Sequence, residues 1–284
     1  MKKPVTLLDG AVGTSLWEKA EAAGAKKNPV WTYNLEHPEF VRALYTEYAE
    51  AGAEIILANT FGANGPAVQR ASSYDTKTVV STGVRLAKET LSGTGAKIAL
   101  AAGPLSMLME PYGDLEEDEV AEIYAEMFSA GMDAGADLIC LQTFMDADMM
   151  RVAAGEAKKF GVPVFCTLSF EKRGKTMMGN SPADIVEQLE PLGIDAVGVN
   201  CSVGPELALP VLKAFAEATT LPLIFKPNAG LPTVTENGTE PYTPEQFAVD
   251  VLPALEYASY IGGCCGTNPS FIRALSQKLA DTVI

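Results

Sequence analysis

Three cysteines stand at the ends of two apolar segments that have the composition of buried strands. Cys201 ends the segment AVGVNCS, and the adjacent pair Cys264 and Cys265 ends YIGGCCG. Thiolates are soft ligands that suit zinc, and a tetrahedral site with three protein ligands leaves one position for water or substrate. That open position is typical of a catalytic zinc site. The three cysteines are therefore candidate zinc ligands.

Two other interpretations of these cysteines stay open. Cys264 and Cys265 could form a vicinal disulfide, or all three thiols could be inert packing. Neighbouring residues of a regular strand point in opposite directions, so both can bind one ion only if the chain turns within GGCCG, which its glycines permit. A substrate thiol in the open position of a zinc site would lose its proton and become a nucleophile for an alkyl group. The chemistry indicated is S-alkylation.

The remaining cysteines favour a reduced protein. Cys140 and Cys166 lie inside apolar segments, where a free thiol behaves as a small hydrophobic side chain. Five cysteines, two of them adjacent, form a poor disulfide framework, and a chain of 284 residues can bury a core that needs no disulfides. We expect reduced thiols in a reducing compartment.

The segments that must position these cysteines alternate between strands and helices. Eight short runs are nearly continuously apolar, as expected of parallel strands covered on both faces. These runs are Val5–Ala11, Glu54–Phe61, Lys97–Pro104, Asp137–Phe144, Val162–Phe170, Ala196–Ser202, Leu223–Gly230 and Ala258–Gly266. Between them, helices are predicted at Pro38–Ala51, after Asp114–Asp118, and at Ser181–Leu192, Pro205–Ala218, Thr243–Leu255 and Pro269–Asp281.

Eight strands alternating with helices favour an α/β fold closed as a single (β/α)₈ TIM barrel, with an open doubly wound sheet as the competitor. No Gly/Ser-rich linker or charge block divides the chain, so one domain over residues 1–284 is expected. In such a barrel the active site forms at the carboxyl ends of the strands. Besides the cysteines, the candidate pocket residues at these ends are Asp9, Gly10, Ala11, Asn59, Thr60, Gln142, Thr143, Asn200 and Asn228.

Composition excludes some partners. The net charge of −15 repels nucleic acid and anionic lipid, so neither is an expected partner. Every apolar run is interrupted by Gly, Pro or charge well before the roughly 18 residues of a membrane helix, and MKKPVTLLDG has no signal-peptide core. A cytoplasmic protein is expected.

Five motifs carry a resemblance to a known family. They are LLDGAVGT (Leu7–Thr14), ANTFGAN (Ala58–Asn64), GVNCSVGP (Gly198–Pro205), KPNAGLP (Lys226–Pro232) and GGCCGTNP (Gly262–Pro269). Together they resemble the homocysteine S-methyltransferase family, most closely the homocysteine-binding barrel of cobalamin-dependent methionine synthases, from Val5 to about Leu275. The resemblance implies a (β/α)₈ barrel, zinc bound by Cys201, Cys264 and Cys265, and methyl transfer at a zinc-held sulfur.

The resemblance also implies how a substrate is held. In the family the acidic residue of the first motif, here Asp9, helps to hold the substrate ammonium, assisted by backbone groups of the glycine-containing turn. A second acidic residue usually precedes Thr-Phe at the end of strand four, but this chain has Gln142 there. Gln keeps an acceptor oxygen and loses the charge that strengthens the bond. Either the exchange is tolerated because Asp9 supplies the charge, or the substrate is not homocysteine.

The expected activity is zinc-dependent S-methylation of homocysteine to methionine. No part of the 284 residues is left over for a corrinoid domain, and NTFGAN and KPNAG resemble the corrinoid-linked branch, so a separate methyl-corrinoid protein is the expected donor. The alternative is the reverse reaction, in which a methylated small compound such as a thioether is demethylated and the corrinoid protein is charged. A non-catalytic zinc or ligand-binding barrel, closed by a fourth protein ligand, is the third possibility.

Three further features complete the sequence predictions. The single histidine, His37, precedes Pro38 at a helix entry, which predicts a capping or surface role. Trp17 and Trp31 are predicted to serve packing, with a rim position over the pocket as the alternative. The long polar segment from Asn228 to Pro244 is either a functional lid or a solvated surface excursion.

Overall fold

The computed structural model describes residues 5–230, 233–235, 238–240 and 242–282. In this part of the chain eight strands form one parallel sheet in the order β1-β10-β7-β6-β5-β4-β3-β2. The strands are β1 (Thr6–Leu7), β2 (Ile55–Leu57), β3 (Lys97–Ala102), β4 (Leu138–Phe144), β5 (Val164–Leu168), β6 (Ala196–Asn200), β7 (Leu223–Lys226) and β10 (Ala258–Ile261).

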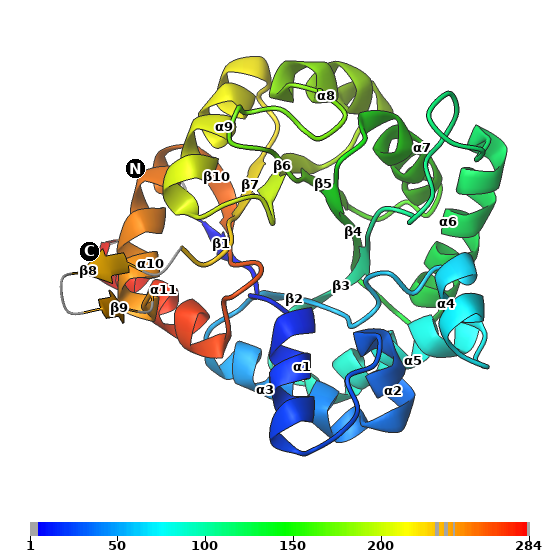
Figure 1. The fold of residues 1–284 in the computed structure, drawn as a ribbon, viewed down its shortest axis with the longest axis horizontal. Helices are drawn as coiled ribbons and strands as arrows, with labels where there is room; N and C mark the ends of the chain where they lie inside the picture. The colour runs from blue at the N-terminus through cyan, green and yellow to red at the C-terminus, as the bar shows by residue number, and fades with distance from the viewer. Residues whose placement is uncertain (1–4, 231–232, 236–237, 241, 283–284) are drawn as a thin grey trace.

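The two end strands of this order meet, so the sheet is closed. Leu8 forms a parallel bridge with Ile55. The amides of Glu54 and Asp9 donate to the carbonyls of Leu7 and Ile55, at 2.7 and 3.2 Å. Figure 1 shows the resulting ring of strands with helices around it. The predicted (β/α)₈ barrel is confirmed, and the open doubly wound sheet is wrong because hydrogen bonds join β1 to β2.

Helices cover the outer face of the barrel (Figure 1). Those following the strands are α1 (Gly13–Ala22), α2 (Tyr33–Glu36), α3 (Pro38–Glu50), α4 (Gly65–Ala71), α5 (Thr76–Thr90), α6 (Glu117–Asp133), α7 (Ala147–Lys158), α8 (Pro182–Leu189), α9 (Pro205–Ala218), α10 (Pro244–Val251) and α11 (Pro269–Thr282). Short 3₁₀ turns occur at Val30–Thr32, Glu190–Leu192 and Leu252–Glu256. The predicted helices are confirmed to within a few residues, and the last turns of two of them are 3₁₀.

Local sequence explains where these helices begin. Pro38 occupies the first turn of α3, where a missing amide hydrogen has no cost. His37 is the residue before it, and its ring stacks on Phe40 rather than capping the helix through its side chain. At α6, Glu116 and Glu119 form a reciprocal capping box. The predicted position of His37 at a helix entry is confirmed, whereas its half-buried side chain makes no capping hydrogen bond.

Apolar side chains form two cores on the two faces of the sheet. The inner core fills the barrel with residues such as Leu57, Ala99 and Cys140, and the outer core lies between strands and helices and includes Cys166. Burial raises the pKa of Cys140 to about 12, and burial raises the pKa of Cys166 as well. Both remain protonated packing residues, as predicted, and the continuous apolar runs are explained by burial on both faces.

The strands end earlier than the sequence patterns predict. The first run was expected to extend to Ala11 and the last to Gly266, whereas β1 ends at Leu7 and β10 at Ile261. The polar and glycine residues that follow leave the hydrogen-bonded ladder and form the loops at the carboxyl end of the barrel. These are the loops that carry the candidate site.

The segment from Asn228 to Pro244 lies partly outside the described residues, namely at 231–232, 236–237 and 241. Its described part contains an antiparallel hairpin of β8 (Thr233–Thr235) and β9 (Gly238–Glu240). Figure 1 places this hairpin outside the ring of strands. Its role as a lid stays a prediction. In the described part of the chain no helix is long and apolar enough to cross a membrane.

Gly198 in β6 is expected to be indispensable for the barrel, because a Cβ there would lie 2.0 Å from the carbonyl oxygen of Ile224 in β7. Gly198→Ala should lower the free energy of unfolding by about 3 kcal/mol, the upper end for overpacking. As a control, Gly155→Ala in α7 meets nothing within 4 Å and should stabilise by about 0.5–1 kcal/mol. Urea unfolding of reduced protein compares them; equal stabilities of the two variants would contradict the argument.

Candidate metal centre and its cavity

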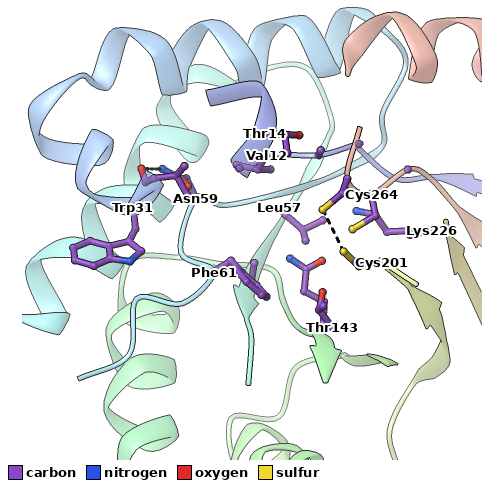
Figure 2. Close-up of a pocket in the computed structure, with 18 of the residues that line it drawn as sticks. Val12, Thr14, Trp31, Leu57, Asn59, Phe61, Thr143, Cys201, Lys226 and Cys264 are labelled. Atoms are coloured by element: carbon purple, nitrogen blue, oxygen red, sulfur yellow. Dashed lines mark hydrogen bonds between the residues drawn. The ribbon is translucent and has the colours of Figure 1, made fainter. Parts of the chain in front are cut away.

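The sulfur atoms of Cys201, Cys264 and Cys265 converge at the carboxyl end of the barrel. All three Sγ atoms lie within 4.8 Å of one another, and those of Cys201 and Cys265 are 3.2 Å apart. Figure 2 shows Cys201 and Cys264 pointing toward the same space. All five cysteines are free thiols, so the structure contains no vicinal disulfide. The cluster is the predicted one, and the chain does turn within GGCCG as it requires.

Backbone hydrogen bonds hold the cysteine loops in place. The amide of Cys264 donates to the carbonyl of Pro227 at 2.8 Å, and the carbonyl of Cys265 accepts from Ala229 at 2.9 Å. Thr267 closes the turn by donating from its hydroxyl to the carbonyl of Cys264 at 2.7 Å. Gly266 completes the turn with φ of 79°, a conformation that favours glycine. Cys264 and Cys265 are therefore placed by the backbone of the loops after β7 and β10.

Asn200 links the metal-ligand cluster to the neighbouring strand end. Its Oδ1 accepts from the amide of Thr143 at 2.8 Å, and its Nδ2 donates to the Thr143 hydroxyl at 2.8 Å and to Cys264 Sγ at 3.8 Å. Thr143 and Cys201 have φ of 63° and 47°, and among the described residues they are the non-glycine positions with positive φ. Strained backbone of this kind concentrates at functional sites.

The three thiols share their protons unequally. Hydrogen bonds from Cys201 and from Cys264 hold the pKa of Cys265 well below the usual range of a thiol. The bond with Cys201, the bond with Cys265 and burial raise the pKa of Cys264. A hydrogen bond with Cys264 lowers the pKa of Cys201, but the bond with Cys265 and burial outweigh it and raise this pKa to about 11. At neutral pH the cluster is one thiolate that accepts from two thiols.

The donor set fits a tetrahedral thiophilic metal ion. Zinc–sulfur bonds of about 2.3 Å at tetrahedral angles require sulfur atoms about 3.8 Å apart. The Cys201–Cys265 separation of 3.2 Å is shorter than that value and no pair of sulfur atoms is more than 4.8 Å apart, so small side-chain rotations suffice. Among the described residues, no fourth Cys, His, Asp or Glu joins this group. A metal ion held here would keep one position for an exogenous ligand.

A cavity of about 350 Å³ lies beside the cysteines. Its lining is mostly apolar and includes aromatic side chains from the loops after β1 and β2. The residues concerned are Gly10–Thr14, Trp17, Pro29–Trp31, Leu57–Asn59, Phe61, Ala101, Gln142, Thr143, Cys201, Lys226 and Gly263–Cys265. Figure 2 shows Trp31 and Phe61 on the side of the cavity away from the sulfurs, whereas Lys226 lies beside the sulfurs. The open metal position therefore faces a pocket of small-molecule size.

A buried ion pair lies under this pocket. Lys226 Nζ donates to Asp9 Oδ1 at 2.6 Å, and the amide of Leu57 donates to Asp9 Oδ2 at 2.8 Å. Asp9 is 0% exposed and Lys226 is 3% exposed. Burial by itself would lower the pKa of Lys226, but the Asp9 carboxylate raises it above the usual value. Lys226 is thus protonated at neutral pH, and both oxygens of Asp9 are occupied.

The structure brings together only part of the set predicted from sequence. The three cysteines, Gly10, Ala11, Asn59, Gln142 and Thr143 line the cavity, whereas Asp9, Thr60, Asn200 and Asn228 do not. Thr60 instead joins its loop to β3 through bonds with both backbone groups of Ala101, at 2.8 and 3.1 Å. Asn228 has a buried Oδ1 without a partner. Direct substrate contact by these four stays a prediction.

Several lining residues were missed by the sequence interpretation. Lys226 lay in the quoted KPNAGLP motif and is a lone charge at the end of an apolar run, which is a usable signal. Trp17 and Trp31 were assigned mainly to packing, yet both line the cavity. Trp31 lies there because a 3₁₀ turn folds back over the strand ends, and nothing in the local sequence indicates that path.

The barrel and its three-sulfur group define a class of protein, the (β/α)₈ barrels with thiols at the strand ends that could hold a metal ion beside a small-molecule cavity. The family model "Homocysteine S-methyltransferase" matches residues 6–279. The chain belongs to the homocysteine S-methyltransferase family.

Comparisons with individual proteins agree. The chain is 27% identical over 266 residues to methionine synthases of Mycobacterium leprae and Mycobacterium tuberculosis, matching 87% of this chain and 22% of each relative. It thus spans about a fifth of their length. Among solved structures, the oxidized homocysteine methyltransferase MmuM from Escherichia coli is 26% identical with a TM-score of 0.77 and 96% of both chains covered. The metallated form has 23% identity, a TM-score of 0.79, and covers 98% of this chain and 97% of its own.

Proposed function

We propose that the chain is a zinc-dependent S-methyltransferase in which Cys201, Cys264 and Cys265 hold the zinc ion and a small thiol occupies the fourth position. The observation that carries the proposal is the convergence of three sulfurs on the wall of a small-molecule cavity. Bound zinc keeps a coordinated thiol deprotonated at neutral pH. Homocysteine, named in the family description, is the reference substrate and methionine the corresponding product.

The side chains of the site do the positioning. Asn200 forms hydrogen bonds with Cys264 Sγ and the Thr143 amide, so the Cys264 sulfur stays oriented toward the cavity. The apolar wall with Trp31 and Phe61 excludes water from the reacting sulfur. A thiolate without its hydration shell is the better nucleophile for a methyl group. The new sulfur–carbon bond forms as the bond between the methyl carbon and the donor breaks, and its electron pair leaves with the donor.

The methyl donor in this proposal is a corrinoid-bearing protein. The similarity to methionine synthases supports it, and so does the surface around the pocket. Large apolar side chains lie 38–70% exposed in the loops after β2, β3 and β5 and in the first turn of α9; they are Phe61, Met107, Leu108, Tyr112, Met177 and Leu207. In a parallel barrel these segments share the strand-end face. Exposed apolar surface around an active-site mouth is typical of a protein docking site.

The test is a methyl-transfer assay with zinc-loaded, reduced protein, a methyl-corrinoid protein or free methylcobalamin, and a thiol. Loss of the methylcobalamin absorbance should match the thioether formed, and a chelator should stop both. If metal-free protein transfers methyl groups as fast as zinc-loaded protein, the proposal is wrong.

A second candidate is the reverse reaction, demethylation of a thioether with transfer to the corrinoid protein. The neutral Gln142 in the pocket favours it, since a substrate other than homocysteine is then expected. Incubation of a methylated thioether with reduced corrinoid protein distinguishes the two directions. The non-catalytic barrel is less supported, because among the described residues no fourth ligand closes the site.

Zinc uptake is expected to depend steeply on pH. Two of the three thiols are protonated at neutral pH, because the pKa of Cys201 is raised to about 11 and that of Cys264 is raised also. Binding as three thiolates therefore releases two protons, and the apparent zinc affinity should rise about 100-fold per pH unit between roughly pH 6 and 8. Competition with a chelator of known pH dependence measures it. A pH-independent affinity would contradict the assigned protonation states.

A further inference from the structure

The charge of the cavity lining departs from the charge of the molecule. The chain has 36 acidic residues, yet none of the described residues that line the cavity is Asp or Glu. Apart from the cysteines, Lys226 is the charged side chain in that lining. An ammonium group entering this cavity meets no free carboxylate and one cation. Since a buried charge needs a partner, this lining disfavours a cationic ligand.

The nearest carboxylate is already engaged. Asp9 is fully buried, and its two oxygens accept from Lys226 at 2.6 Å and from the Leu57 amide at 2.8 Å. Asp9 is not part of the cavity lining, so a substrate ammonium could reach its carboxylate only if neighbouring groups moved and the buried pair with Lys226 was disturbed. Breaking a buried ion pair costs more than a new ion pair of the same kind returns. Asp9 thus neutralises Lys226 and is shielded from a ligand in the cavity.

Gln142 completes the neutral lining. It lies at the end of β4, half-buried, on the cavity wall. Its amide group offers a neutral acceptor and two donors, which suit a hydroxyl, an amide or a carboxylate. A carboxylate side chain at the same position would prefer an ammonium. The remaining wall is apolar, with Trp31 and Phe61 away from the sulfurs, so it can bury an uncharged tail.

We propose that the substrate of this site is a thiol, or its methyl thioether, that carries no ammonium group and has a neutral or anionic tail. The inference rests on the proposed function, because it takes the substrate sulfur to lie at the three-cysteine centre. The neutral Gln142 and the Asp9–Lys226 pair together select against α-amino thiols. The Gln142 amide can donate to an anionic tail, and the cavity lining holds no carboxylate to repel it.

Three matched thiols test this inference by isothermal titration into zinc-loaded protein. Homocysteine carries both an ammonium and a carboxylate, 4-mercaptobutyrate lacks the ammonium, and 3-aminopropanethiol lacks the carboxylate. We expect 4-mercaptobutyrate to bind at least about tenfold more tightly than homocysteine, and 3-aminopropanethiol to bind most weakly. X-ray absorption at the zinc edge should show a fourth sulfur with the tight ligand.

Variants separate the charge from the shape of the pocket. Gln142→Glu is nearly isosteric and should tighten homocysteine about tenfold while weakening 4-mercaptobutyrate. Gln277→Glu, the same exchange at an exposed position of α11, should change neither affinity. Wild-type protein that binds homocysteine more tightly than 4-mercaptobutyrate would overturn the inference. If no thiol adds a sulfur to the metal centre, the proposed function itself fails, which is a distinct result.

Discussion

Replacement of Cys201 by serine is expected to abolish methyl transfer and to weaken zinc binding by more than about 100-fold. Loss of a residue that only supports a metal ligand costs up to about 100-fold in affinity, so loss of a direct ligand should cost more. A serine hydroxyl stays protonated at neutral pH and is a harder, shorter ligand than a thiolate. With one sulfur missing, the remaining two belong to one short loop, Cys264 and Cys265, and no longer enclose the ion from two strands. Zinc content per chain and single-turnover methyl transfer measure the two effects.

Cys166→Ala is the matched control. Cys166 is fully buried in the outer core and takes no part in the cluster. Its truncation should lower stability modestly, while one zinc per chain and the transfer rate are kept. If Cys201→Ser retains both zinc and turnover, the assignment of the metal centre is wrong.

Lys226→Met is expected to lower the free energy of unfolding by about 3–5 kcal/mol at neutral pH, because it leaves the Asp9 carboxylate buried without its ion partner. Asp9→Asn combined with Lys226→Met should recover most of this loss. The asparagine Oδ1 can still accept from the Leu57 amide, and no charge remains buried. Urea unfolding of reduced, metal-free protein compares the variants.

The pH dependence of Lys226→Met gives an independent check. Burial raises the pKa of Asp9, and without the lysine ammonium the folded-state pKa should rise further above the unfolded value. A carboxyl group with a raised folded-state pKa binds more protons in the folded state than in the unfolded state. The Lys226→Met variant is therefore least destabilised at acidic pH, and its stability falls as the pH rises. The double variant has no carboxyl group there and should not show this trend. A pH-independent deficit would contradict the ion-pair explanation.

The barrel and its cluster of three cysteines could be predicted because their signals are local. Continuous apolar runs reflect burial on both sheet faces, and the polar residues after each run mark the strand ends. Cys201 and the Cys264–Cys265 pair each follow such a run, so the topology alone brings them to one end. The alternation of strands and helices predicts the parallel barrel itself.

Other features depend on contacts that sequence does not display. Asp9 and Lys226 are 217 residues apart, and the sequence around each indicates only a polar residue at the end of a strand. Their pairing gives Asp9, which was predicted to bind a substrate ammonium, a buried lysine as its partner, and this partner could not be inferred from either residue alone. The predicted strands were too long because many of the residues that follow them are apolar or small and could continue a strand. In the structure these residues leave the hydrogen-bonded sheet and form the loops of the site.

The left-handed backbone at Thr143 and Cys201, joined through Asn200, bears on how the proposed zinc ion would be loaded and released. These conformations and their hydrogen bonds form with the barrel, so the entropy of gathering the ligands is lost during folding and little remains to be lost at loading. Metal removal should consequently leave a folded receptor. If the proposed zinc dependence holds, metal uptake and release would be reversible steps of the folded protein, and zinc supply would change the active fraction without changing the amount of folded protein.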